Sequence, residues 1–248
     1  MSTKNQPAPL LELNSTDSTN NYAMRLVHAG LAQPGGAVLA YAQTAGKGQR
    51  GKTWASPPGE SLSLSLLLQP TFLLPAQGFQ LLAATAAGVR DILSHCCGRD
   101  LHIKWMNDLY QGDRKAGGIL IENLVNGNRW NWAVVGIGIN VNQEAFDPSL
   151  PNPVSLRQIT GRVTPVRPLA EQLQAAVLQR VQQLETEGFA PLLAIYNQWL
   201  YKRDDEVRFR QGSRVFTAVP AEVDAEGLLY TRQGHRFRFG EVEWQPAI

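Results

Sequence analysis

Hydrophobic and polar positions along the chain alternate with two different periods. Residues 61–66 read Ser-Leu-Ser-Leu-Ser-Leu, which predicts a strand with one apolar face towards a core and one face of small polar side chains. Residues 75–97 are rich in alanine and leucine, and residues 168–187 repeat apolar side chains at helical spacing, so both segments predict helices. Strand-like and helix-like segments follow one another without a clear internal repeat, and the plan is α+β.

Shorter segments complete this plan. Ser18 or Thr19 can cap a helix that is predicted to run through about His28 and to end at Gly30, a natural left-handed terminator. Residues 116–125 and 130–141 predict a hairpin, because the Asn-Gly-Asn sequence between them favours a turn. Residues 10–13 form a short apolar run, residues 37–43 and 101–104 predict strands, and residues 191–200 predict a further short helix.

The character of the chain changes after Leu200. A charged link at residues 202–206 leads into strand-like runs with glycines at the turns, at residues 207–210, 214–223, 228–231 and 236–239. This pattern predicts a small all-β barrel, so residues 1–200 and 201–248 are expected to form two domains. Residues 202–248 hold eight Lys or Arg and eight Asp or Glu residues, whereas a nucleic-acid-binding barrel usually carries a basic stripe. Docking or support of a lid is the better interpretation.

Composition narrows the class of protein. The 248 residues are 44% hydrophobic, enough for a full core, and the net charge of +2 does not indicate a nucleic-acid partner. Cys96 and Cys97 are adjacent in a predicted helix and are expected to be a small buried apolar pair in a reducing compartment, without a structural metal. The polar N-terminus lacks the apolar core of a signal peptide, and no run reaches the roughly 18 apolar residues of a membrane span. A soluble cytoplasmic protein without a membrane partner is expected.

Residues 44–60, TAGKGQRGKTWASPPGE, match two phosphate-binding patterns at once. The P-loop pattern G-x-x-x-x-G-K-[ST] and the dinucleotide pattern G-x-G-x-x-G both begin at Gly46. Each works only where the loop enters a helix directly, whereas Pro57 and Pro58 prevent a long helix from beginning here. The dinucleotide pattern also needs an acidic residue about 20 positions later, where this chain is apolar. Neither motif is therefore expected.

What the segment retains is a basic, glycine-rich loop. Lys47, Arg50 and Lys52 lie close together with Trp54 behind them, and no acidic residue occurs from Ser18 to Gly59. A flexible loop of this kind suits an anionic ligand with a flat ring. The alternative, a solvated glycine-rich turn, remains open for this segment alone.

Two further segments carry candidate chemistry. Lys104, Asn107 and Asp108 lie around the end of one predicted strand, and Lys115 precedes Ala-Gly-Gly, where a ligand could approach the backbone closely. Residues 134–142 alternate glycine with β-branched residues. On a strand this alternation places two glycines and one asparagine on one face, which predicts a flat backbone wall for a flat ligand. Close packing of a neighbouring strand is the alternative explanation.

Five of these segments occur in the order that is typical of one enzyme family. STN (residues 18–20), GKGQRGKTW, KWMNDL, KAGGILIE and GIGIN match the family pattern S-T-N, G-[RK]-G-R-x-G-R-x-W, K-W-P-N-D-[IL], K-x-[AG]-G-I-L-x-E and G-[IA]-G-[IL]-N. The chain thereby resembles the biotin-protein ligases over roughly residues 10–200. Five motifs in register are far more specific than any one of them.

The resemblance implies a fold and an activity. The fold would be a mixed sheet flanked by helices, similar to class II synthetases, with a C-terminal SH3-like barrel. The activity would be ATP-dependent activation of biotin as biotinyl-5′-AMP, with Mg²⁺, and transfer of the biotinyl group to a lysine of the biotin carboxyl carrier protein of acetyl-CoA carboxylase. A homodimer is left open. Only 17 residues precede Ser18, so the DNA-binding domain of the family's regulatory members is not expected, nor is a nucleic-acid partner.

The resemblance also assigns roles to residues. Lys115 and Lys47 are the expected catalytic cations, and Asp108 is expected to orient the acceptor amine or the metal. The ring of biotin is expected to contact Ser18, Thr19, Asn20 and Gln43. Further biotin-binding positions are Lys47, Gly48, Gln49, Lys115, Gly136 and Gly138. The adenylate is expected to contact Lys47, Arg50, Trp54, Asn107, Lys115 and Asn140, with Trp54 covering adenine and Asn140 reading its edge.

Two positions depart from the family pattern. Met106 replaces a proline, and Gln49 replaces an arginine that helps to retain the acyl-adenylate, so retention of the adenylate is expected to be poorer unless Arg50 or Lys52 substitutes.

Two rival functions are considered. One rival is a lipoate or octanoate transferase of the same fold class; the octanoyl transferases use a cysteine nucleophile, but the two cysteines of this chain lie away from every motif. The other is a protein that binds biotin without turnover, against which the intact Lys115 argues.

Overall fold

A seven-stranded mixed sheet forms the centre of the molecule. The computed structural model describes residues 9–245, so the polar N-terminal segment up to residue 8 lies outside this range. The strand order is β1 (Leu10–Leu13), β2 (Ala37–Ala40), β3 (Ser61–Leu68), β7 (Arg129–Asn140), β6 (Arg114–Asn126), β5 (Asp108–Gln111) and β4 (His102–Lys104). Strands β1 and β2 pair in parallel, and the other neighbours are antiparallel, which confirms the predicted mixed sheet.

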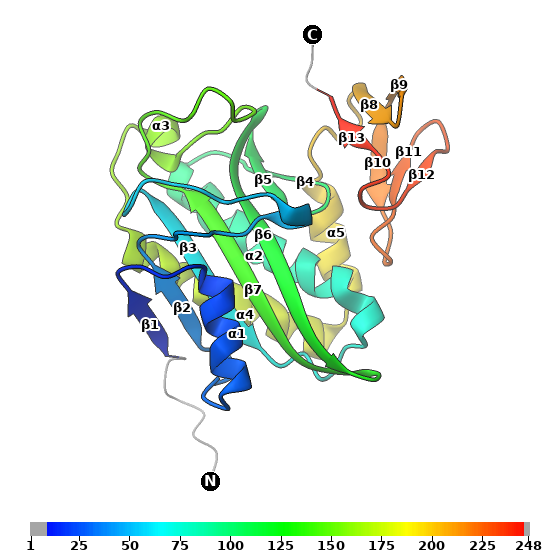
Figure 1. Cartoon of the computed structure of the whole chain (residues 1–248). Coiled ribbons are helices and arrows are strands. Elements are labelled where there is room, and N and C mark those ends of the chain that lie inside the picture. The colour runs from blue at the N-terminus through cyan, green and yellow to red at the C-terminus, as the bar shows by residue number, and fades with distance from the viewer. Residues whose placement is uncertain (1–8, 246–248) are drawn as a thin grey trace.

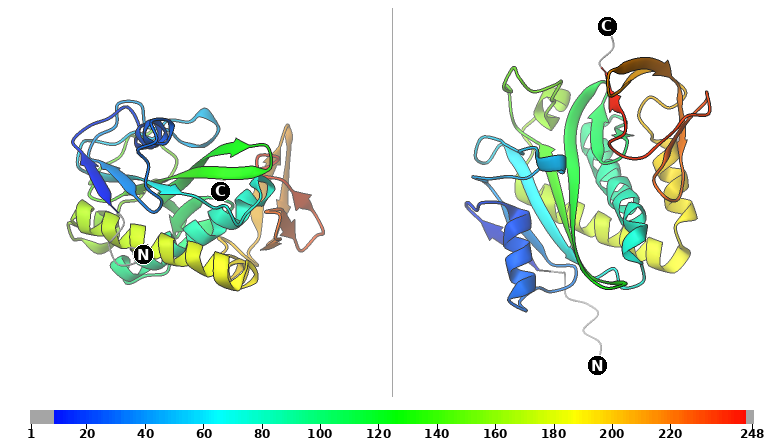
Figure 2. Two further views of the ribbon diagram at one scale, coloured as in Figure 1. Left: turned by 90° about the horizontal axis from the view of Figure 1, so that it is seen from below. Right: turned by 45° about the vertical axis from the view of Figure 1, so that its right-hand side comes forward.

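Helices cover both faces of this sheet. Helix α1 (Thr19–His28) lies on one face, and α2 (Gly78–Cys97), α4 (Val166–Glu187) and α5 (Ala190–Gln198) lie on the other (Figures 1 and 2). Short helical segments occur at η1 (Gln49–Gly51), η2 (Pro75–Gln77) and α3 (Leu156–Thr160). No helix in the described part of the chain is both long enough and apolar enough to cross a membrane.

Strand β3 shows why the Ser-Leu alternation produces a central strand. Four of its leucines, such as Leu64, are buried in the main apolar cluster together with residues of α2 and α4, whereas Leu67 packs with Ala23 of α1 and Val134 in a second cluster. Its serines are buried as well, because α1 covers the other face. Ser65 Oγ donates to Asn20 Oδ1 (2.6 Å) and lies 2.8 Å from Thr19 Oγ1. The strand therefore has a core on each side, which corrects the prediction of a single core-facing side.

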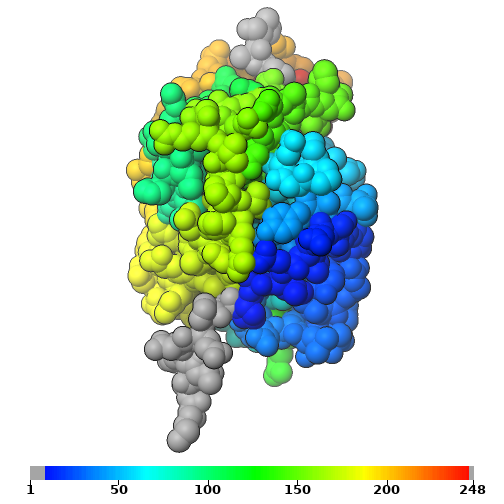
Figure 3. Space-filling view, turned by 90° about the vertical axis from the view of Figure 1, so that its left-hand side faces the viewer, coloured from blue at the N-terminus to red at the C-terminus, as the bar shows by residue number. Residues whose placement is uncertain are grey.

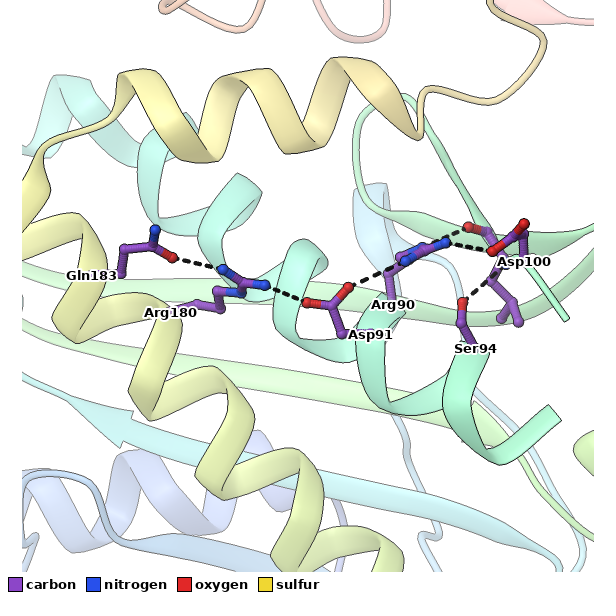
Figure 4. A network of polar contacts seen from close by, with 7 residues as sticks. Arg90, Asp91, Ser94, Asp100, Arg180 and Gln183 are labelled. Atoms are coloured by element: carbon purple, nitrogen blue, oxygen red, sulfur yellow. Dashed lines mark hydrogen bonds and ion pairs between the residues drawn. The ribbon is translucent and has the colours of Figure 1, made fainter. Parts of the chain in front are cut away.

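A polar network ties α2 to its neighbours behind the sheet (Figure 4). Arg90 is almost fully buried; it donates to the Leu101 carbonyl (3.1 Å) and pairs with Asp100 (2.9 Å) and Asp91 (3.3 Å). Asp91 also accepts from Arg180 of α4 at 2.6 Å. A buried guanidinium is tolerated because its N–H groups have partners, and this one fixes α2 against α4 and the start of β4.

The outer edge of the sheet is joined to the helical layer at the surface. Strand β1 lies beside α4 on the face shown in Figure 3. Glu12 of β1 pairs with Arg167 of α4 at 3.2 Å and accepts from Tyr41 Oη at 2.8 Å. These contacts bring the N-terminal edge of the sheet next to a helix more than 150 residues further along the chain.

The C-terminal region consists of two three-stranded sheets. One contains β10 (Pro220–Val223), β11 (Leu229–Thr231) and β12 (Arg236–Phe237), and the other contains β13 (Glu243–Trp244), β8 (Val207–Gln211) and β9 (Arg214–Ala218). The strand pairings of the described residues do not close into one barrel, so the predicted barrel is not confirmed. Residues 214–223 form two strands in different sheets because Pro220 has no N–H to continue a ladder. The buried apolar residues of these sheets belong to the main cluster.

Several local predictions need correction. Strand β2 ends at Ala40, and the chain rejoins the sheet only through an isolated bridge between Thr16 and Gln43. The sequence did not reveal β5, α3 or β13, which are two to five residues long and carry little periodicity. Cys96 and Cys97 are free and half-buried rather than buried, because they lie in the last turn of α2.

Candidate functional site

One face of the sheet gathers the candidate residues. The register pairs Ser61 with Asn140, Ser63 with Gly138, and Ser65 with Gly136. Cross-strand partners share a face, and side chains two positions apart share it too. By the same rule this face continues onto β6, which pairs Gly118 with Gly138, and onto β5, which pairs Asp108 with Gly118. We call this the polar face of the sheet; it lies under α1 and the basic loop.

The basic loop forms a short hairpin. Lys47 bridges to Thr53, Gly48 N donates to the Lys52 carbonyl at 2.6 Å, and Trp54 N donates to the Gly46 carbonyl at 2.9 Å. A Cβ added at Gly46 would lie 2.2 Å from the Trp54 carbonyl oxygen, so only glycine fits there. The only helical element in the loop is the three-residue η1, as the following prolines predicted.

The N-terminus of α1 is built into the same face. Gln43 Oε1 accepts from Thr19 N (2.7 Å) and Thr19 Oγ1 (3.2 Å). Asn20 Nδ2 donates to Glu122 Oε2 at 2.7 Å, and Lys47 Nζ lies 3.0 Å from Glu122 Oε1. The structure therefore brings together the predicted residues Thr19, Asn20, Gln43 and Lys47. Ser18, the N-cap residue, is also buried there, although its side chain makes no capping hydrogen bond.

Lys115 and Asp108 form an ion pair at the other end of the polar face. Lys115 Nζ lies 2.8 Å from Asp108 Oδ1, and both side chains are about one quarter to one third exposed. Asn107 Nδ2 donates to the same Asp108 oxygen (3.1 Å) and to the Ile119 carbonyl (3.0 Å). A Cβ added at Gly118 would lie 3.0 Å from that Asp108 oxygen and 3.5 Å from Lys115 Nζ. The glycine therefore leaves room for the pair, and Asp108 orients the ammonium group.

The glycine wall on β7 is covered by two side chains rather than by a neighbouring strand. A Cβ added at Gly136 would lie 2.4 Å from Asn20 Oδ1, and one at Gly138 would lie 2.6 Å from Trp54 Cε2. The indole N–H of Trp54 is buried without a hydrogen-bond partner. Trp54 thus lies directly on the glycine strand, so a ring bound there must stack on its indole or displace it.

Three of the predicted adenylate contacts are turned elsewhere. Asn140 Nδ2 donates to the carbonyls of Lys115 and Val154, both at 3.2 Å, so its amide protons already have partners. A Cβ added at Gly240 would lie 3.0 Å from Arg50 Cζ, which places that guanidinium against the C-terminal region. The third is Asn107, whose amide holds Asp108 and Ile119. Gln49, predicted to contact biotin, donates to the Ile119 carbonyl at 3.2 Å.

Lys104 does not join the Lys115 pair. Its Nζ donates to Tyr110 Oη at 3.2 Å and lies 4.5 Å from the centre of that ring, with Tyr201 and Trp244 at 5.6 and 5.7 Å. Burial lowers the pKa of Lys104 to about 8. Lys104 therefore connects the sheet edge to the C-terminal region. A separate cavity of about 260 Å³ is lined by residues that include Met106, Gly227 and Phe239.

Sequence reasoning missed two residues of the polar face. Glu122 is the last residue of the fourth motif and has no expected role, yet its carboxylate joins Lys47 to Asn20. Ser65 was read as part of a strand pattern, yet its hydroxyl holds Thr19 and Asn20. The only signal for Glu122 was its charge, because it is the single acidic residue of the β6–β7 hairpin.

Comparisons with known proteins identify the family and the relatives of this chain. Residues 12–140 match the model of the biotin/lipoate A/B protein ligase family. A biotin-[acetyl-CoA-carboxylase] ligase from Paracoccus denitrificans is 34% identical over 89% of this chain and 92% of its own length. The bifunctional ligase/repressor BirA of Escherichia coli is 29% identical over 88% of this chain and 67% of its own length.

A solved structure gives the same result for the whole fold. The biotin protein ligase from Aquifex aeolicus, solved in complex with biotin and ATP, superposes with a TM-score of 0.81 at 25% identity and covers 96% of this chain and 99% of its own. The family match spans the basic loop, α1 and strands β2 to β7, which together build the polar face. The chain belongs to the biotin/lipoate A/B protein ligase family and, within it, to the biotin-protein ligases.

Proposed function

We propose that this chain is an ATP-dependent biotin-protein ligase that forms biotinyl-5′-AMP and transfers the biotinyl group to a carrier lysine. The observation that carries the proposal is that one sheet face holds Lys47 and Lys115 beside the glycines of β7. Biotin carboxylate and ATP are both anions, so a site that brings them together needs cations. The relatives named as biotin ligases, and the neighbour solved with biotin and ATP, support the same substrates.

In the first half-reaction an oxygen of the biotin carboxylate attacks the α-phosphorus of ATP and pyrophosphate leaves, which requires no protein nucleophile. Negative charge develops on the nonbridging oxygens of that phosphorus. Lys115, held by Asp108 at 2.8 Å, and Lys47 are the groups proposed to stabilise it. Preorganisation by Asp108 matters because the ammonium group then needs little reorientation during the reaction.

In the second half-reaction the amine of a carrier lysine attacks the carbonyl carbon of the mixed anhydride, and AMP leaves. We assign Asp108 to the orientation of that amine. The carboxylate accepts from Asn107 and pairs with Lys115, so its position is fixed from two sides. The carrier protein of acetyl-CoA carboxylase is the proposed acceptor, by analogy with the Paracoccus relative's name.

The residues of the polar face fit an Mg²⁺ ion that arrives with ATP. Mg²⁺ in such sites is usually held by one or two carboxylates together with substrate phosphates. Asp108 supplies one carboxylate, and the described residues contain no cluster of three or more His, Cys, Asp or Glu side chains. When bound, the ion would neutralise phosphate charge, and the role of this chain would be to offer Asp108 beside Lys115.

Trp54 and Asn140 are the further proposed adenylate contacts. Trp54, which lies on Gly138, is proposed to stack on adenine, and Asn140 would have to exchange its present hydrogen bonds to read the base edge.

Residues 1–200 and 201–248 are proposed as the catalytic and C-terminal domains, the latter of SH3-like type. A homodimer is compatible with the open edge of β1.

The cysteines argue against the octanoyl-transferase alternative. A nucleophilic cysteine needs a lowered pKa, whereas burial raises the pKa of Cys96 and, with the neighbouring Cys96 thiol, raises that of Cys97 to about 11. Both lie at the end of α2, on the face of the sheet opposite the polar face.

The test is incubation with ATP-Mg²⁺, a biotin carboxyl carrier domain and either biotin or lipoate, followed by mass spectrometry of the carrier. Addition of one biotinyl group to a single lysine is expected, with pyrophosphate released. Lipoylation in place of biotinylation would support the transferase alternative. Biotin binding without pyrophosphate release would support a binding protein without turnover.

A further inference from the structure

The carboxylate of Glu122 joins parts of the polar face that come from distant segments. Its Oε1 lies 3.0 Å from Lys47 Nζ in the basic loop, and its Oε2 accepts from Asn20 Nδ2 of α1 at 2.7 Å. Asn20 is fixed in turn by Ser65, whose hydroxyl donates to its Oδ1 at 2.6 Å. One carboxylate on β6 therefore joins an amide of α1, which lies over Gly136, to an ammonium group of the basic loop.

The charge pattern explains why the loop needs this partner. Lys47, Arg50 and Lys52 lie within six residues, and no acidic residue occurs from Ser18 to Gly59, so the loop cannot neutralise itself. Arg50 is turned towards Gly240. Glu122 reaches Lys47 from the sheet instead. The two side chains are 30% and 41% exposed, and a pair of this kind contributes little net free energy because water screens it. Lys47 can therefore change partners easily.

We propose that Glu122 is a positioning residue for Lys47. It holds the ammonium group over the polar face before a ligand arrives, and it sets how strongly the site prefers a carboxylate to a neutral group. The inference rests on the proposed function in one respect, because the ligand carboxylate is that of biotin. Glu122 acts through Lys47 and touches no reacting atom.

The carboxylate of Glu122 and the carboxylate of a bound ligand therefore compete for the ammonium group of Lys47. With Glu122 present, a bound carboxylate shares the charge of Lys47 with the carboxylate of the protein. Glu122→Gln removes the protein's negative charge, so the attraction of Lys47 for a ligand anion strengthens. The same change removes the anchor of the loop in the free enzyme. These two effects are measured separately.

The first experiment measures the loop without any ligand. Trypsin cleavage after Arg50, followed by mass spectrometry, is expected to be about two- to fivefold faster in Glu122→Gln than in wild type, the range of an exposed ion pair. In a Lys47→Gln background the same substitution should have no further effect. Glu12→Gln, which removes the 3.2 Å pair with Arg167, is the matched control and should leave cleavage unchanged. Trypsin cleavage of Glu122→Gln at the wild-type rate would overturn the proposal. So would an equal acceleration by Glu122→Gln in the wild-type and Lys47→Gln backgrounds.

The second experiment compares biotin with biotinamide, its neutral amide, by calorimetry. Because both ligands require the same loop position, the ratio of their affinities isolates the charge effect. Glu122→Gln should raise the preference for biotin about two- to fivefold, and Lys47→Gln should abolish that gain. An unchanged or lower ratio would contradict the proposal. If neither compound binds the wild-type protein, the proposed function fails, while loop cleavage still decides whether Glu122 positions Lys47.

Discussion

The two faces of the central sheet are made by alternate residues of the same strands, and they differ in almost every property. On β3 four leucines point into the main apolar cluster with α2 and α4, whereas the serines and Leu67 lie on the side of α1. On β7, Ile137 and Ile139 belong to the first face, and Gly136 and Gly138 to the second. Both faces of β3 are buried, but Gly136 and Gly138 on the polar face of β7 are partly exposed. Only the polar face presents hydrogen-bonding groups and backbone without side chains.

Alternate positions of one strand therefore serve different purposes. Those on the apolar face stabilise the fold, and those on the polar face provide the chemistry of the site. An apolar face contributes free energy roughly in proportion to the area it buries. A face of small and polar residues contributes less, since each buried polar group must find a partner. In return it offers room and fixed dipoles for a ligand. Substitutions one position apart on the same strand should therefore change different properties.

Leu64→Ala on the apolar face should destabilise the fold by about 2–5 kcal/mol, because it leaves a cavity in a fully buried site. Urea unfolding followed by circular dichroism measures the loss. The matched control is Ser63→Ala, one position away on the polar face, which should change the free energy of unfolding by under about 1 kcal/mol. Similar losses for both substitutions would break the distinction between the faces.

Lys115→Ala on the polar face should reduce adenylate formation by about 10² to 10³, because it removes a preorganised charge at a developing oxyanion. Pyrophosphate release measures the rate, and biotin binding should be largely retained. The free energy of unfolding should change by no more than about 0.5 kcal/mol, as for most partly exposed positions. A rate within about threefold of wild type, far below the expected loss, would remove Lys115 from its assigned role.

Gln49→Arg should slow the release of biotinyl-AMP by about ten- to a hundredfold, the equivalent of one charge-assisted hydrogen bond of about 1.5–3 kcal/mol. Escaped adenylate acylates lysines without selectivity, so the variant should label a bystander such as albumin less than wild type does. Arg50 is turned towards Gly240 and does not compensate from its present position. Unchanged labelling of albumin would mean that Arg50 or Lys52 already supplies the missing charge.

The basic loop should be protected a few-fold from proteolysis when biotin and ATP are both present. The hairpin is held by few backbone hydrogen bonds and is rich in glycine, so a ligand that engages its cations should order it further. Cleavage between Gly46 and Trp54, followed by mass spectrometry, is the measurement. Either ligand alone serves as the control. Equal cleavage with and without both ligands would show that the loop is no lid.

The sequence was most informative where periodicity is long. The Ser-Leu alternation, the alanine-rich helix and the Asn-Gly-Asn turn predicted β3, α2 and the β6–β7 hairpin, because each records which face is buried over several residues. Strands of two or four residues such as β13 and β5 carry no such record. The division of the C-terminal strands into two sheets was not predictable, because the strand-like runs do not say which strands pair.

For the candidate site, the sequence supplied the residue types and the tertiary structure supplied their partners. The pattern of cations, glycines and amides was readable in one dimension, and so was the exclusion of a P-loop, because prolines act locally. The pairing of Lys47 with Glu122, 75 positions away, was not readable, since it depends on strand order and register.

The sequence by itself therefore determined the family, the alternation that gives the sheet two unlike faces, and the chemistry available to the polar face. Only the tertiary structure decided that α1 buries the serines, that Trp54 lies on Gly138, and that Arg50 faces the C-terminal region. The physical reason is that a strand pattern specifies which side chains share a face. What covers that face depends on contacts between segments far apart in the chain.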